Sequence, residues 1–201
     1  MKQPNNRKLI HIPVIHTSDD MGTLKTYAKK AFLLKSGAAL LHQKETLIEH
    51  IWDLIVQYVN SLKLEYQRVK IYQDGLPVCG KELEIVSDLA KYGSRNHKLV
   101  LALAQKGATI MGTESAGLLV QEYQLVKTTI TKASTKAEQV IKNNSVYDEL
   151  LKKRDEFIAH RILNTLQSNE TGILFLGMLH NVNHLFKNKI NVIQFRETPS
   201  A

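Results

Sequence analysis

Cysteine is almost absent from this sequence, because the 201 residues contain a single one, Cys79. One cysteine cannot form a disulfide within the chain, and it cannot supply a zinc ribbon or an iron–sulfur cluster. We therefore expect a reducing, cytoplasmic location. A zinc site in this chain would have to use histidine and carboxylate ligands.

Long apolar runs are missing as well. No stretch approaches the roughly 18 to 20 consecutive apolar residues that cross a bilayer, so we expect no membrane partner. The polar residues 1–8 lead into a short apolar run that contains His11 and Pro13. This pattern is neither a secretory signal nor a lipidation signal. The sequence also has no GxGxxG, P-loop, GxSxG or HExxH motif.

The charge balance is basic but dispersed. There are 27 Lys and Arg against 19 Asp and Glu, which gives a formal net charge of +8. This charge favours anionic partners, but no basic run reaches four residues, so we do not expect nucleic-acid binding as the main function. Hydrophobic residues make up 43% of the chain and charged residues 23%, as in ordinary globular proteins. The length predicts a single domain over residues 1–201.

Five short apolar segments have the pattern of strands, and helical patterns lie between them. The predicted strands are 8–15, 68–72, 108–111, 172–176 and 189–195, and the predicted helices are 43–62, 81–91, 95–105, 115–141 and 146–166. This alternation predicts an α/β three-layer sandwich with a mainly parallel sheet of about five strands.

Two local features refine this fold prediction. Residues 115–166 form a long helical insertion before the fourth strand, and we expect a break at Asn143, Asn144 and Ser145. Pro13 removes a backbone donor from the first strand, so we expect that strand to lie at an edge of the sheet or to be bulged there.

Polar residues follow four of the predicted strands. His16 follows the first strand, Asp74 the second, Glu114 the third and His180 the fourth. Ligands of open parallel sheets bind at the carboxyl ends of the strands, so these side chains converge if the strands are neighbours. Each also has a structural interpretation: Asp74 begins an Asp-Gly turn, Glu114 suits the first turn of a helix, and an isolated histidine is commonly structural.

Arg154 lies within the apolar stripe of the helix 146–166, between Leu151 and Ile158. A guanidinium that faces inward needs an anion, since burying it unpaired costs several kcal/mol. Its partner is Glu114, Asp74 or a ligand, and a buried ion pair that ties the helix to the sheet is the structural alternative. Asp155 borders the same stripe, where it can orient Arg154 or a histidine.

A second cluster, Arg95 and His97, opens the helix 95–105. A helix N-terminus beside Arg and His is a candidate anion site. Ser94 as an N-cap explains the same pattern structurally.

These residues together resemble the erythromycin esterase / ChaN / TraB–Tiki superfamily. The resemblance rests on the segment 14–17 (Val-Ile-His-Thr), a glutamate after a middle strand, the Arg154-Asp155 pair, and the segment 177–180 (Gly-Met-Leu-His). The first motif has Pro13 where the family has glycine. The resemblance implies a site of His16, Glu114, Arg154 and His180, with Asp74 as the alternative acidic member.

The same resemblance implies two chemistries. In one, a glutamate orients a histidine that deprotonates water for ester hydrolysis. In the other, His16, His180 and Glu114 hold a divalent ion (Zn, Mn or Co) for peptide hydrolysis. In both, Arg154 would neutralise a developing oxyanion.

Our leading hypothesis is therefore a hydrolase, esterase-like or metalloprotease-like, that acts on a small-molecule or peptide substrate, anionic substrates included. Asp74, Arg95, His97 and Asp155 are expected to contact that substrate. Two alternatives stay open. The first is a non-catalytic binder of a nucleotide or another anionic ligand at the same strand ends. The second is a protein-interaction module built on the helices 43–62 and 115–166, and the sequence leaves homo-oligomers open.

Overall fold

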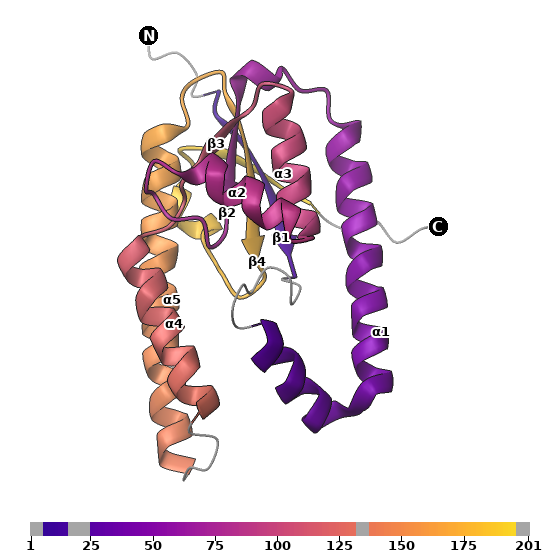
Figure 1. The fold of residues 1–201 in the computed structure, drawn as a ribbon. Coiled ribbons are helices and arrows are strands. Elements are labelled where there is room, and N and C mark those ends of the chain that lie inside the picture. The colour runs from indigo at the N-terminus through magenta and orange to yellow at the C-terminus, as the bar shows by residue number, and fades with distance from the viewer. Residues whose placement is uncertain (1–5, 16–24, 132–136, 196–201) are drawn as a thin grey trace.

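The computed structural model describes residues 6–15, 25–131 and 137–195 (Figure 1). The strands are β1 Lys8–Val14, β2 Val69–Gln73, β3 Thr109–Met111, β4 Thr171–Gly177 and β5 Asn191–Gln194. The α-helices are α1 Lys25–Ser61, α2 Glu82–Lys91, α3 Arg95–Gln105, α4 Ala116–Thr131 and α5 Ala137–Thr165. Two short 3₁₀ helices, η2 Tyr66–Arg68 and η3 Asn183–Phe186, complete the described elements.

The strands form one five-stranded sheet in the order β3-β2-β4-β1-β5. Every pairing in this sheet is parallel. Val14 is in register with Gly177 and Gln73 with Phe175, so β1, β2 and β4 end close to the same level. The predicted α/β fold with a parallel sheet is confirmed.

Helices cover both faces of the sheet and complete three layers. On one face, Trp52 and Ile55 of α1 and Val100 of α3 pack against inward side chains of the strands. On the other face, Ile158 and Ile162 of α5 pack against side chains from β1, β2 and β4. The central strand β4 is buried on both faces, as its continuous apolar run predicts.

The insertion between β3 and β4 is a pair of helices, α4 and α5 (Figure 1). The predicted break at residues 143–145 is wrong, because α5 runs through these residues from Ala137. Asn and Ser lower helix stability by only about 0.5 kcal/mol each, which is too little to end a helix of 29 residues. Likewise, α1 begins at Lys25, well before the predicted start at residue 43, in a segment rich in good helix formers.

The expectation for Pro13 needs a correction. β1 is not an edge strand, since it lies between β4 and β5. However, β5 pairs only with the segment Lys8 to His11 of β1, and the carbonyl of His11 accepts the last of these bonds from Phe195. Pro13 lies beyond that point, so its missing donor faces no partner strand.

No helix in the described ranges is both long and apolar enough to cross a membrane.

Packing of α1 on the sheet predicts unequal effects of two truncations in this helix. Ile55 is fully buried, whereas Leu47 is 58% exposed. We expect Ile55→Ala to lower the free energy of unfolding by about 2 to 5 kcal/mol, because it leaves a cavity in the core. Leu47→Ala should stay within about 0.5 kcal/mol of the parent protein. Urea unfolding measures both, and equal losses would contradict this placement of α1.

Candidate functional site

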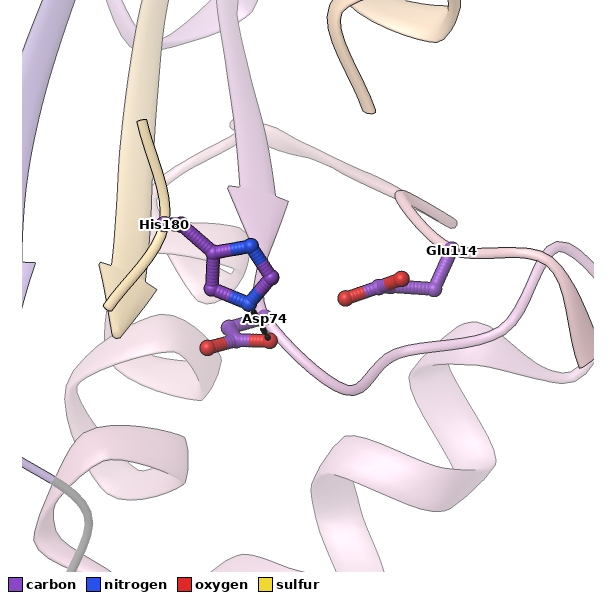
Figure 2. Close-up of side chains that lie close together, drawn as sticks. All are labelled: Asp74, Glu114 and His180. Carbon is purple, nitrogen blue, oxygen red and sulfur yellow. Dashed lines mark ion pairs between the residues drawn. The ribbon is translucent and has the colours of Figure 1, made fainter. Parts of the chain in front are cut away.

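Three neighbouring strand ends bring Asp74, Glu114 and His180 together (Figure 2). One possible ligand atom from each residue lies within 4.8 Å of the others. β2 lies between β3 and β4, which explains why the residues after these three strands meet. The predicted convergence is therefore found for these three residues. His16 lies outside the described residues.

Backbone hydrogen bonds join the loops after β2 and β3 and thereby position Glu114. The carbonyl of Leu76 accepts bonds from the N–H groups of Thr113 (2.9 Å) and Glu114 (3.0 Å). The N–H of Val78 donates to the carbonyl of Glu114 at 2.9 Å. Gly75 makes the turn at a positive φ of 72°, a conformation that favours glycine. As a result, the side chain of Glu114 is fully buried and points toward Asp74 and His180 (Figure 2).

The close approach of these two loops also requires Gly112. A Cβ atom at this position would lie 2.7 Å from Cα of Val78 and 2.8 Å from the carbonyl oxygen of Pro77. Both distances are shorter than van der Waals contact, so a larger residue would push the loops apart. The carbonyl of Gly112 accepts a bond from Nε of Arg161, which adds a contact to α5.

Arg154 of α5 is the hub of the site. Its Nε and Nη2 donate to the two carboxylate oxygens of Glu114 at 3.1 and 2.6 Å. Nη2 also donates to Asp74 at 2.9 Å, and Nη1 donates to Glu122 of α4 at 2.6 Å. The inward orientation predicted for Arg154 and its pairing with Glu114 and Asp74 are thus found in the structure. The paired bonds from Nε and Nη2 to the two oxygens of Glu114 form a bidentate contact, which is the strongest form of Arg–carboxylate contact.

His180 is held by a different carboxylate, Asp155. Its Nδ1 lies 2.5 Å from Oδ1 of Asp155, and Oδ2 of the same carboxylate accepts the backbone N–H of Asn181 at 2.9 Å. On the other side of the ring, Nε2 lies 3.6 Å from Oδ1 of Asp74. The second oxygen of Asp74 accepts the backbone N–H of Gly177 at 2.9 Å, which fixes the end of β4. Asp155 therefore orients the histidine, as one of the sequence hypotheses proposed.

Negative charge predominates in the site. The carboxyl groups of Asp74, Glu114, Glu122 and Asp155 surround one guanidinium and one imidazole. Burial raises the pKa of Glu114, while Arg154 opposes that shift and Asp74 adds to it. The pKa of Arg154 is raised by the same carboxylates, although burial opposes this rise. The carboxylates in this cluster therefore outnumber the groups around them that can carry a positive charge.

A cavity of about 560 Å³ opens onto these groups. Asp74, Glu122, Arg154 and His180 line it together with His97. His97 is buried, and its Nδ1 lies 2.7 Å from Oγ of Ser94. His97 thus lies where a ligand in the cavity would meet it.

Arg95 does not line this cavity. Its guanidinium pairs at the surface with Glu49 and Asp53 of α1, each at 2.5 Å. Ser94 caps α3 by accepting the N–H of His97, which supports the structural alternative for this segment. Arg95 is therefore a link between α1 and α3 and not part of the site.

Sequence reasoning did not single out Glu122 or Tyr147. Glu122 lies three residues after Leu119 on the apolar stripe of α4, the same signal that identified Arg154 on α5. Tyr147 lines the cavity and donates from its hydroxyl to Glu122 at 3.4 Å. Burial raises the pKa of Tyr147, and the charge of Glu122 raises it further.

Comparisons of the chain with protein-family models, with curated proteins and with solved structures found no match. The resemblance to the erythromycin esterase / ChaN / TraB–Tiki superfamily therefore stays a prediction from short motifs. The geometry of the described residues carries the rest of the functional argument.

The contacts of Arg154 predict a large effect of its removal. We expect Arg154→Leu to lower the free energy of unfolding by about 3 to 5 kcal/mol at neutral pH, because buried carboxylates lose their counter-charge. Arg95→Leu is the matched control, since it removes two ion pairs at the surface, whereas Arg154→Leu removes three in the buried network. Arg95→Leu should cost about 1 kcal/mol or less. Urea unfolding followed through the single tryptophan, Trp52, measures both, and similar losses would argue against the buried network.

The raised pKa of Glu114 predicts a pH dependence of stability. The unfolded chain releases this proton near pH 4.5, whereas the folded protein holds it to higher pH. The stability that this pKa shift contributes to the free energy of unfolding is therefore fully present below pH 4.5, and it is lost as the pH rises through the pKa of Glu114 in the folded protein. Glu114→Gln has no proton to release, so the unfolding free energy of the parent minus that of the variant should decrease over this window. An increase with pH would mean that the folded pKa is lowered instead.

Proposed function

We propose that this protein is a hydrolase whose reaction centre is the cluster of Asp74, Glu114 and His180, acting with a divalent metal ion. The observation that carries the proposal is the convergence of these three side chains on one point at the carboxyl end of the sheet, beside a cavity. Carboxylate oxygen and imidazole nitrogen are ligands for Zn, Mn and Co, the ions that the sequence hypotheses named. Asp74 takes a ligand position in this proposal, where the motif resemblance implied His16.

Two features of the site favour a metal ion. The carboxylates exceed the positive charges around them, so a cation relieves their repulsion. The bond between Asp155 and Nδ1 of His180 leaves Nε2 as the nitrogen that faces Asp74. A carboxylate behind a histidine is the usual arrangement for an imidazole that binds a metal. When bound, the ion lowers the pKa of a water molecule and polarises a carbonyl group.

The side chains of the chain have separate roles in this proposal. Asp155 holds the ring of His180 in one orientation and tautomer. Arg154 keeps the carboxylates of Asp74 and Glu114 at a fixed distance from each other, since it bonds to both. We assign this positioning role to Arg154 in place of oxyanion stabilisation, because four hydrogen bonds already occupy its guanidinium.

The alternative of an anion-binding protein is less consistent with the site. The cation that faces the cavity, Arg154, is already paired with carboxylates. Asp74 and Glu122 add negative charge to the cavity wall. In the metal-free protein, a nucleotide phosphate would meet like charge there, which costs binding energy.

The proposal is tested by metal binding and by turnover in the same variants. The protein is stripped with a chelator and titrated with Zn, Mn or Co in a calorimeter, and hydrolysis is followed with p-nitrophenyl acetate. We expect one of these ions to bind and to restore hydrolysis. His180→Ala should abolish both, and Asp155→Asn should weaken metal binding by about 10- to 100-fold, because the ring loses its orienting partner.

The control is His184→Ala, which removes an exposed histidine from the following 3₁₀ helix. This variant should bind the metal and hydrolyse the ester like the parent. Full hydrolysis by the chelated protein would reject the metal, and full hydrolysis by His180→Ala would reject the site.

A further inference from the structure

Apolar as well as charged side chains line the cavity beside the cluster. The charged ones are described above. The apolar ones come from five different elements or loops, and they include Val14, Leu89, Leu119, Leu151, Met178 and Leu179.

Met178 and Leu179 are unusually exposed for apolar side chains. They are 64% and 71% exposed, and they lie in the turn that carries His180. Both also line the cavity, so a molecule bound there would cover them. Exposed apolar surface that borders a cavity is typical of a ligand-binding site.

The charged lining residues of the cavity restrict the charge of the ligand. Four bonds to carboxylates use nearly all the N–H groups of Arg154. The other charged side chains at this wall, Asp74 and Glu122, are acidic. In the metal-free protein, a negatively charged group next to this wall would therefore be repelled, whereas an uncharged carbonyl group would not.

The size of the cavity limits the ligand further. Its volume of about 560 Å³ falls within the range of small-molecule sites, roughly 300 to 1,000 Å³. A small molecule with a linear apolar portion would contact the apolar lining residues of the cavity while its polar end meets His180.

The geometry points to a substrate class: an uncharged ester or amide whose acyl chain is apolar and lies against Leu119, Leu151 and Leu179, with its carbonyl at His180. This inference rests on the proposed hydrolase function for the reaction. Water adds to the carbonyl carbon, the bond to the leaving oxygen or nitrogen breaks, and the leaving group takes a proton from that water. The products are a carboxylic acid and an alcohol or amine.

The inference is tested with ligands that bind but cannot be hydrolysed. Methyl propyl, methyl pentyl and methyl heptyl ketones keep the carbonyl and the apolar chain, and they contain no ester or amide bond. Butanoate, hexanoate and octanoate are the anionic counterparts of the same chain lengths. Binding of each compound to the wild-type protein is measured by calorimetry, with and without the metal ion that supports hydrolysis.

We expect ketone affinity to rise by up to about fourfold for each methylene group that the cavity buries. In the absence of the metal ion, each carboxylate should bind more weakly than the ketone of the same length. Leu119→Ser and Leu179→Ser should reduce the dependence on chain length. Leu47→Ser, which changes an exposed leucine of α1 away from the cavity, should leave it intact. Thermal unfolding of each variant separates a binding loss from a folding loss, and Leu179 is exposed enough to tolerate serine.

The outcomes separate the two proposals. Ketone binding that increases with chain length supports the apolar subsite, whether or not an ester is hydrolysed. If such binding is found and no ester is hydrolysed, the hydrolase proposal is rejected and the apolar subsite stands. Hydrolysis of p-nitrophenyl acetate without chain-length-dependent ketone binding would overturn the apolar subsite and leave the hydrolase standing. Carboxylates that bind the metal-free protein more tightly than the ketones would also overturn it.

Discussion

The buried guanidinium of Arg154 is the interaction on which the site depends. It bonds to Asp74 after β2, to Glu114 after β3 and to Glu122 of α4, so one side chain links two strand ends and two helices. None of these groups could be buried at low cost without the others, since each isolated charge would lose its hydration. The position of the α4–α5 pair relative to the sheet edge therefore follows from electrostatics as well as from apolar packing.

Parallel topology explains why the chemistry gathers at one edge. β2 lies between β3 and β4, so the residues that follow these strands meet although they are far apart in the sequence. The insertion between β3 and β4 then adds Glu122, Arg154 and Asp155 from its two helices. The strand ends supply Asp74, Glu114 and His180, and the insertion supplies the groups that bond to them.

The charges and the apolar surface of the cavity together determine which kind of ligand fits it. Arg154 is occupied by carboxylates, so the positive formal charge of the whole chain does not extend to the candidate site. Apolar side chains such as Met178 and Leu179 border the same site. The local balance of groups, and not the net charge, decides which ligand fits, because only nearby charges act strongly on a bound molecule.

Sequence patterns predicted the fold class and the convergence of Asp74, Glu114 and His180. Short apolar runs indicated the five strands, and three- to four-residue spacing indicated the buried faces of the helices, since burial dictates those patterns. The inward position of Arg154 predicted a buried anion because an unpaired guanidinium is too costly. The tertiary structure decided what local patterns do not contain: the strand order, the participation of Glu122, and the continuity of α5 through Asn143 and Asn144. It also assigned Arg95 to a surface link, because partners distant in the sequence are chosen by packing and not by local propensity.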